Sequence, residues 1–387
     1  MRKKILLVAL LLFGALLLSG CTGATAWPGL TADGQTAYLA DGPRVFSISL
    51  KDGKENWQYP LQADSKLVFY AAPLVTPDGL VIFGSAGVDH SLFAVDPKKF
   101  PSTPVQQMSG ISKFFCSLSG TCPVYNVEQW TFKGAKDHWV ATPLLLNNKL
   151  FAPNADGNLY VLNMNDGTLI KQIKLGGDSN NANRLWSQPV TNSKYVFVTS
   201  LDRSVYAIDV ETYQIVWHED LTGAIPGGAV LGSDGMLYVG SLAKQLEKFD
   251  PETGKHESVL DAKGWIWSTP IADGDNVYFS DVDGYFYSYN TKDGKLNFDA
   301  VKPDSAITAS PMVLGNKVLL ATESGGVYAV SQDGAIDTWY KLDGKGKAYT
   351  TPVMGGDLVL VSYLESDYYL VALNQDGGLK WTYPPKK

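Results

Sequence analysis

The sequence predicts an all-β fold, an eight-bladed β-propeller built from four-stranded antiparallel blades. Apolar runs of about five residues, rich in Val, Tyr, Phe and Ile, alternate with tight turns, and the dipeptide Asp-Gly occurs thirteen times. Glycine tolerates the positive φ of such turns, and aspartate bonds its own backbone there. Short strands joined by hairpins therefore make up most of the chain.

A repeat, clearest from Thr269 to Phe298, supplies the second observation. Each unit opens with a proline, and these prolines are Pro28, Pro73, Pro143, Pro189, Pro226, Pro270, Pro311 and Pro352. They are separated by 45, 70, 46, 37, 44, 41 and 41 residues. One meander of four strands cannot bury both of its faces alone, so such units stack around a central axis.

The sequence leaves two features of the ring open, the number of blades and the way in which the ring closes. Charged residues interrupt the usual apolar run at 245–249, so a seven-bladed ring with one degenerate unit is the alternative. The first unit begins with its inner strand and the last ends with its outer strand. This order suggests closure without strand exchange.

The N-terminus has the pattern of an export signal. Met1–Lys4 is basic, Ile5–Leu18 is an apolar run of about fourteen residues, and Leu-Ser-Gly-Cys ends at Cys21. A run this short, with basic residues ahead of it, predicts a secretory signal over residues 1–20 and not a membrane-spanning helix. Its end resembles the bacterial lipobox, which implies lipidation, palmitate included, at Cys21.

The same resemblance bears on location. Thr22 is not the aspartate that, in the enterobacterial sorting rule, keeps lipoproteins on the inner membrane. Under that rule we expect the periplasmic face of the outer membrane. In a cell with one membrane, the outer face of that membrane is expected.

Residues 21–387 leave room for one propeller domain, expected to be monomeric, with about 46 residues per blade. The full chain has 32 Lys+Arg and 39 Asp+Glu, and three bases lie in the signal, so the mature part has 29 against 39, a net charge of −10. No basic run lies outside the signal. This balance argues against nucleic acid as a partner.

An aromatic ends the fourth strand of most units, where it can fill the wedge between blades. These residues are Trp57, Trp217, Phe298, Trp339 and Trp381. With Val-Tyr-Ala-Ile-Asp at 205–209, Leu-Phe-Ala-Val-Asp at 92–96 and Val-Tyr-Ala-Val at 327–330, the pattern resembles the tryptophan-docking repeat of the pyrroloquinoline quinone (PQQ) propeller family. Units two, three and five match least, because they lack the aromatic at its usual spacing.

The resemblance allows enzymes and non-catalytic scaffolds alike. Quinoprotein dehydrogenases of this family have two adjacent bridged cysteines, a calcium and a catalytic aspartate, whereas Cys21, Cys116 and Cys122 are not adjacent. The four histidines form no metal-ligand spacing. Asp137 and His138 are expected on a strand, with side chains on opposite faces. We therefore predict no catalytic residues, no bound PQQ and no metal, and interpret Asp281-Val282-Asp283-Gly284 as a turn and not a calcium loop.

Two surfaces are candidate binding sites. The period breaks at an insertion of about residues 100–137, where Phe114 and Phe115 are expected to form an apolar tip and Cys116 and Cys122 a disulfide, since the protein is exported. A hairpin folded back on blade two is the alternative.

The second surface is a set of aromatics placed three residues before an opening proline. They are Tyr70, Trp186, Trp267 and Tyr349. If the opening strand is innermost, as in this family, they lie around the central mouth, where a peptide or extended strand would bind. Packing between blade tops is the alternative.

Three functions are consistent with the sequence. The first is a non-catalytic, lipid-anchored envelope scaffold that binds other envelope proteins, similar to the propeller lipoproteins of the outer-membrane β-barrel assembly machinery. The second is a PQQ-dependent dehydrogenase or sugar-binding quinoprotein relative. The third is a surface propeller for ligand sensing or adhesion.

Overall fold

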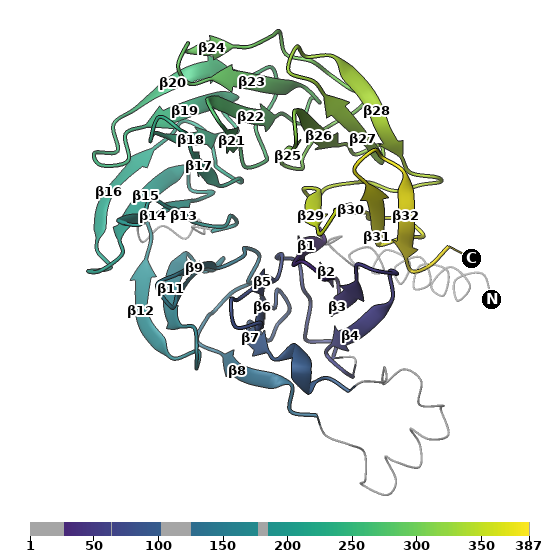
Figure 1. The fold of residues 1–387 in the computed structure, drawn as a ribbon. Coiled ribbons are helices and arrows are strands. Elements are labelled where there is room, and N and C mark those ends of the chain that lie inside the picture. The colour runs from purple at the N-terminus through teal and green to yellow at the C-terminus, as the bar shows by residue number, and fades with distance from the viewer. Residues whose placement is uncertain (1–26, 63, 102–124, 177–184, 387) are drawn as a thin grey trace, which may run out of the picture.

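The chain folds into a closed ring of eight four-stranded antiparallel sheets (Figure 1). The structure is a computed structural model and describes residues 27–62, 64–101, 125–176 and 185–386. The predicted eight-bladed propeller is confirmed, and the seven-bladed alternative is wrong. The charged segment 245–249 forms a regular strand, so blade 5 is complete.

Within every blade, the strands follow one another in chain order, so each blade is a simple meander. Blades 1 to 4 comprise β1 (Gly29–Ala32), β2 (Thr36–Asp41), β3 (Arg44–Ser49) and β4 (Glu55–Tyr59); β5 (Leu74–Val75), β6 (Val81–Gly84), β7 (Leu92–Val95) and β8 (Glu128–Phe132); β9 (Leu144–Leu146), β10 (Lys149–Pro153), β11 (Asn158–Asn163) and β12 (Leu169–Lys174); and β13 (Val190–Thr191), β14 (Tyr195–Thr199), β15 (Ser204–Asp209) and β16 (Ile215–Asp220).

The second half of the ring has the same plan. Blades 5 to 8 comprise β17 (Ala229–Leu231), β18 (Leu237–Gly240), β19 (Gln245–Phe249) and β20 (His256–Asp261); β21 (Ile271–Asp273), β22 (Asn276–Ser280), β23 (Phe286–Asn290) and β24 (Lys295–Leu296); β25 (Met312–Leu314), β26 (Lys317–Ala321), β27 (Gly326–Val330) and β28 (Ile336–Lys341); and β29 (Val353–Gly355), β30 (Leu358–Ser362), β31 (Leu370–Asn374) and β32 (Leu379–Tyr383).

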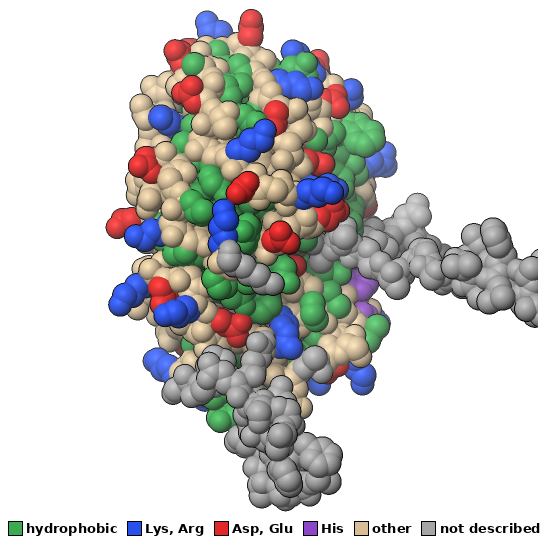
Figure 2. Space-filling view, turned by 90° about the vertical axis from the view of Figure 1, so that its right-hand side faces the viewer, with side chains coloured by type: hydrophobic (Ala, Val, Ile, Leu, Met, Phe, Trp, Pro, Cys, Tyr) green, Lys and Arg blue, Asp and Glu red, His purple; other side chains and the backbone are tan. Residues whose placement is uncertain are grey.

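Among the described residues, the only helix is the three-residue η1 (Pro97–Lys99), which is too short to cross a lipid bilayer. On the side of the ring in Figure 2, Lys and Arg are interspersed with Asp and Glu, so neither sign forms a continuous patch there.

The core lies between blades and not within one sheet. All five residues of β14 are buried, although successive side chains of a strand point to opposite faces. Burial on both faces explains the continuous apolar runs of the middle strands, because a neighbouring blade covers each side. One such cluster joins Phe197 and Trp217 of blade 4 to Leu237 and Phe249 of blade 5.

The terminal aromatics join neighbouring blades at the outer edge of this core. The Nε1 of Trp217 donates a hydrogen bond to the carbonyl of Pro251 (3.0 Å), and its ring covers Gly254 in the β19–β20 turn. Gly254 has φ +75°, and a Cβ there would lie 2.7 Å from the indole. The Asp-Gly and Thr-Gly turns thus serve twice, because glycine permits both the turn and the close approach of the ring.

Blade 2 corrects the predicted insertion of residues 100–137. The segment is not one irregular loop, because residues 128–132 form β8, the outer strand of this blade. Trp130 in β8 donates to the Met164 carbonyl (2.8 Å) and covers Gly167 of blade 3. Unit two therefore has its docking aromatic, displaced in sequence by the residues inserted between β7 and β8.

Three other seams lack the aromatic and glycine pair, among them that of blades 5 and 6, because β20 contains no Trp, Tyr or Phe. Trp57 of blade 1 stacks on Phe100 at 4.2 Å, so the residue after η1 takes the place of a turn glycine. In the seam of blades 3 and 4, the place of the docking aromatic on the outer strand of blade 3 is taken by the exposed Lys171. The place of the turn glycine in blade 4 is taken by Tyr213 (φ +57°). The Tyr213 ring contacts the Phe151 ring of blade 3, so here an aromatic of the turn, and not of the outer strand, packs across the seam.

The ring closes without strand exchange, as predicted, since blades 1 and 8 are each built from consecutive strands. Side-chain hydrogen bonds and a shared apolar cluster join them: Trp381 Nε1 donates to the Leu50 carbonyl (2.9 Å), the Tyr383 hydroxyl donates to Glu55 (2.6 Å), and Thr350 donates to the Pro28 carbonyl (2.5 Å). Side chains, not a shared sheet, close the propeller.

The docking seam can be tested with two glycines of blade 5. We expect Gly254→Ala to lower the free energy of unfolding by about 3 kcal/mol or more, because the methyl group collides with Trp217 in addition to straining the backbone. Gly235 has nearly the same φ, +76°, but nothing lies within 4 Å of its Cβ position. Gly235→Ala should therefore cost only about 1–2 kcal/mol. Chemical unfolding of both variants measures the difference, and equal losses would contradict the docking role.

Candidate functional site

The segments that carry the predicted aromatics and the described ends of the insertion lie on opposite faces of the disc. In an antiparallel meander, the connection between the second and third strands and the connection to the next blade emerge on one side. The turns between the first and second, and the third and fourth, strands emerge on the other. We call the first side the proline face, because it carries the opening prolines, and the second the turn face. The insertion follows β7 and leaves on the turn face.

The segments that lead to the opening prolines alternate between the core and the surface. The residue four places before the proline is buried between blades in six units: Phe69, Trp139, Leu185, Ile266, Ile307 and Ala348. The predicted aromatics, one place later, are half-buried: Tyr70, Trp186, Trp267 and Tyr349. The inter-blade packing role considered as their alternative thus belongs to the preceding residue, and these four rings keep part of their surface open to solvent.

Trp27 brings two of these aromatics together. Its ring lies 5.4 Å from that of Trp267, edge to face, and 6.1 Å from that of Tyr349, stacked. Trp267 precedes blade 6 and Tyr349 precedes blade 8, so a ring that touches both extends past blade 7 across the central mouth. We call Trp27, Trp267 and Tyr349 the mouth cluster. Among the described residues, no ring contact joins Tyr70 or Trp186 to it.

Trp27 was missed in the sequence because it stands one residue before its proline and not three. Its signal was the dipeptide Trp-Pro at the start of the first unit. With 40% of its surface exposed, Trp27 is the most accessible ring of the mouth cluster.

The mouth cluster has a polar side at Tyr349. Burial raises the pKa of the Tyr349 hydroxyl, and the nearby Glu323 raises it further. The hydroxyl therefore stays protonated at neutral pH and can donate a hydrogen bond. Lys347 and Glu365 form an ion pair (3.0 Å) beside it. The mouth thus combines apolar rings with a few polar groups, the composition common in protein-binding surfaces.

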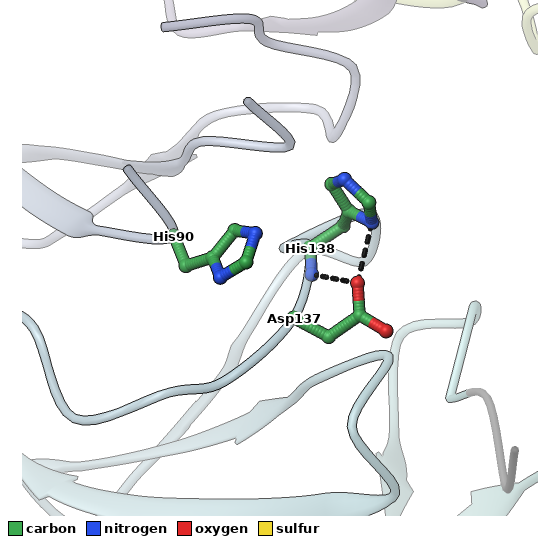
Figure 3. A group of neighbouring side chains, drawn as sticks. All are labelled: His90, Asp137 and His138. Carbon is green, nitrogen blue, oxygen red and sulfur yellow. Dashed lines mark hydrogen bonds and ion pairs between the residues drawn. The ribbon is translucent and has the colours of Figure 1, made fainter. Parts of the chain in front are cut away.

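The structure also corrects the prediction about histidines. His90 follows β6 and His138 precedes β9, yet their rings lie 5.3 Å apart on the proline face (Figure 3). Asp137 and His138 lie in a loop and not on a strand, and Asp137 Oδ1 contacts His138 Nδ1 at 2.5 Å. Two of the four histidines thus form a cluster that sequence spacing alone did not indicate.

The carboxylate of Asp281 supports the turn interpretation of residues 281–284. It is fully buried and accepts hydrogen bonds from the Gly264 amide (2.8 Å), the Tyr285 amide (2.9 Å) and the Tyr287 hydroxyl (2.7 Å). Gly284 has φ +89°, as a turn glycine requires. Asp281 therefore ties the loop of blade 6 to the segment that precedes it.

A cavity of about 380 Å³ lies between blades 6 and 7, where β24 is only two residues long. Its lining is rich in amides, which largely bond to one another. Asn297 donates to Asn276 (2.8 Å) and to Ser288 (2.7 Å). The short outer strand, and not a cluster of reactive groups, accounts for this hollow.

The closed ring of eight meanders, in which most blades dock an aromatic on the turn of the next, defines a class of β-propeller, the tryptophan-docking type. A family model described as "Outer membrane protein assembly factor BamB" matches residues 24–223 and 201–386. The chain belongs to this family.

Individual relatives are distant. The chain is similar to the assembly factor BamB of Moranella endobia, 22% identical over 312 residues, or 78% of this chain and 71% of the relative. It is 24% identical over 243 residues to the BamB of Shewanella oneidensis, which covers 58% of each chain.

Solved structures show the same fold. BamB from Moraxella catarrhalis superimposes with a TM-score of 0.65 at 18% identity, covering 92% of this chain and 95% of that one. A computationally designed protein, Ika8, superimposes with a TM-score of 0.63 at 14% identity, covering 92% and 96%. A natural and a designed protein match about equally, so the likeness bears on fold and not on function.

The role of Asp281 leads to a test against the calcium alternative. We expect Asp281→Ala to destabilise the protein by about 3 kcal/mol, because three donors lose their acceptor. Asp283→Ala, at an exposed position of the same turn, should change stability by no more than about 0.5 kcal/mol. Thermal unfolding with and without CaCl₂ provides the measurement. Stabilisation by calcium that either substitution abolishes would overturn the turn interpretation.

Proposed function

We propose that the chain is a lipid-anchored, non-catalytic scaffold that binds other envelope proteins during outer-membrane protein assembly. The observation that carries this proposal is the family match, which extends over both halves of the chain and therefore over the whole ring. A propeller is suited to this role, because its blades hold loops from distant parts of the sequence in fixed positions.

We propose the mouth cluster as the main docking surface. Tryptophan and tyrosine are the residues that most often dominate binding energy at protein interfaces. Trp267 and Tyr349 stand on separate blades, so the rigid ring sets their spacing before a partner arrives. An extended peptide or a loop of an envelope protein could lay apolar side chains against Trp27 and bond the Tyr349 hydroxyl.

The proposed anchor would keep this surface near a membrane. Cys21 lies outside the described residues and is only six residues before Trp27. Six residues span at most about 21 Å. A lipid on Cys21 would therefore hold the proline face close to the periplasmic surface of the outer membrane, where we place the protein, as a single copy, in this proposal.

The insertion remains a second proposed contact region. Phe114, Phe115, Cys116 and Cys122 lie outside the described residues, so their apolar tip and disulfide stay predictions. The segment leaves from the turn face, opposite the mouth cluster. A partner on the insertion would consequently bind independently of one at the mouth.

PQQ does not fit the residues present. The three cysteines are not adjacent. Asp281, the first carboxylate of the calcium-like segment 281–284, already accepts hydrogen bonds from the Gly264 amide and the Tyr287 hydroxyl. We propose that the chain works without this cofactor. Addition of PQQ and Ca²⁺, followed by dye reduction with alcohols and aldoses, should give no turnover above background. Turnover well above background would favour the quinoprotein alternative.

Crosslinking in intact cells tests the scaffold and its docking surface. We expect an outer-membrane assembly component to be recovered with the wild type, and the double variant Trp267→Ala/Tyr349→Ala to lower that recovery at least tenfold, because two interface aromatics are removed. Ile215→Ala/Val216→Ala is the matched control, since it removes two exposed apolar side chains from β16 on the outer rim.

The outcomes separate the proposal from its alternatives. If the mouth variant recovers the assembly component as well as the wild type does, the docking surface lies elsewhere on the protein, and the scaffold function still holds. Recovery of no assembly component even with the wild type would contradict the proposed function and favour a propeller that senses ligands or mediates adhesion.

A further inference from the structure

We propose that His90, Asp137 and His138 form a binding site for a divalent transition-metal ion, Zn²⁺ in the first instance, that links the loops of blades 2 and 3 on the proline face. One ligand atom from each of the three side chains lies within 4.8 Å of the other two (Figure 3). The residues come from two separate connections, 47 positions apart in the chain. The folded ring, not local sequence, brings them together.

The donor set suits this class of ion. Two imidazole nitrogens and one carboxylate oxygen are a common ligand combination for zinc, whereas Ca²⁺ and Mg²⁺ prefer oxygen donors throughout. Three protein ligands leave a fourth position for water or for a donor from a bound partner.

The side chains need only a small movement to close on an ion. Ligand atoms of a tetrahedral zinc site lie about 3.3 Å apart, so the wider separations in the cluster must shorten by no more than about 1.5 Å. The contact of Asp137 Oδ1 with His138 Nδ1, at 2.5 Å, must lengthen if these two atoms are the ligands. The His138 side chain is 48% exposed, and the Asp137 side chain, 31% exposed, accepts a hydrogen bond from the His138 amide at Oδ1 (2.8 Å). In Figure 3, Asp137 Oδ1 contacts both Nδ1 and the backbone amide of His138, and an ion would replace the contact with Nδ1.

The backbone beneath the cluster is held by Trp139. This fully buried residue follows His138 directly, and its Nε1 donates to the carbonyl of His90 (2.8 Å). Trp139 packs against Gly84, and a Cβ added to Gly84 would lie 2.1 Å from the Cβ of Trp139. One side chain therefore sets the distance between the two histidine loops.

Blade 3 holds the other side of the cluster. Asn154, which is fully buried, donates from its side chain to the Asp137 carbonyl (2.9 Å), and the Ala155 amide donates to the His138 carbonyl (3.0 Å). The backbone of all three candidate ligands is thus restrained. Such an arrangement lowers the entropy lost on binding, and metal sites depend on this support around the ligands.

Titration of the mature chain with ZnCl₂ at neutral pH, followed by calorimetry and thermal unfolding, tests the site. Cys116 and Cys122 are themselves zinc-binding groups when reduced, so the experiment uses a Cys116→Ser/Cys122→Ser background. We expect one ion per chain and a melting temperature that rises with zinc concentration, because the ion binds the folded state.

Substitutions assign the ligands. His138→Ala and His90→Asn should each weaken zinc binding at least tenfold. Asparagine is chosen at position 90 because it tolerates the left-handed backbone there (φ +50°). His218→Ala, at an exposed histidine of β16, is the matched control and should bind zinc like the parent.

The same set of variants can overturn the proposal. If His90→Asn and His138→Ala bind zinc as tightly as the parent while circular dichroism shows them folded, the cluster is not the site. If His218→Ala weakens binding as much as they do, zinc binds exposed histidines without a defined site. Should a variant lose its fold, Asp137→Asn supplies the independent measurement, with an expected loss of about ten- to a hundredfold.

Discussion

The fold depends on packing between blades, and in most seams an aromatic at the end of one blade docks on the turn of the next. A single meander of four short strands leaves both faces apolar, so no blade is stable without its neighbours. Docking fixes how neighbouring blades are placed, because an indole both covers apolar surface of the next blade and donates a hydrogen bond to one of its backbone carbonyls. The contact of Trp381 with Gly53 applies the same device where the first and last blades meet.

The seams are not equivalent, and their differences locate the special features of the molecule. The seam of blades 1 and 2 replaces the turn glycine with Phe100, at the start of the insertion. The seam of blades 2 and 3 contains two tryptophans, Trp130 toward the turn face and Trp139 toward the proline face. The histidine cluster borders the seam of blades 2 and 3, whereas Phe100 and Val127, on either side of the inserted segment, pack in the core between blades 1 and 2.

The binding elements that we propose for this scaffold lie apart in space. The mouth cluster and the histidine cluster lie on the proline face, and the insertion departs from the turn face. Interaction surfaces on opposite sides of a rigid disc allow two partners to bind without competing. The relatives share the disc, whereas these surface elements consist of side chains, and identities near 20% leave them free to differ.

The sequence by itself determined the strands, the eight units and the closure of the ring without strand exchange. These features follow from local turn chemistry and from a repeat whose pattern can be recognised in each unit separately. It also pointed to Trp267 and Tyr349, through their fixed distance from a proline. Only the tertiary structure assigned Trp130 to its blade, added Trp27 to the mouth and placed His90 beside His138. Those relations join residues of different blades, and their distances are set by packing around the whole ring, which no local pattern records.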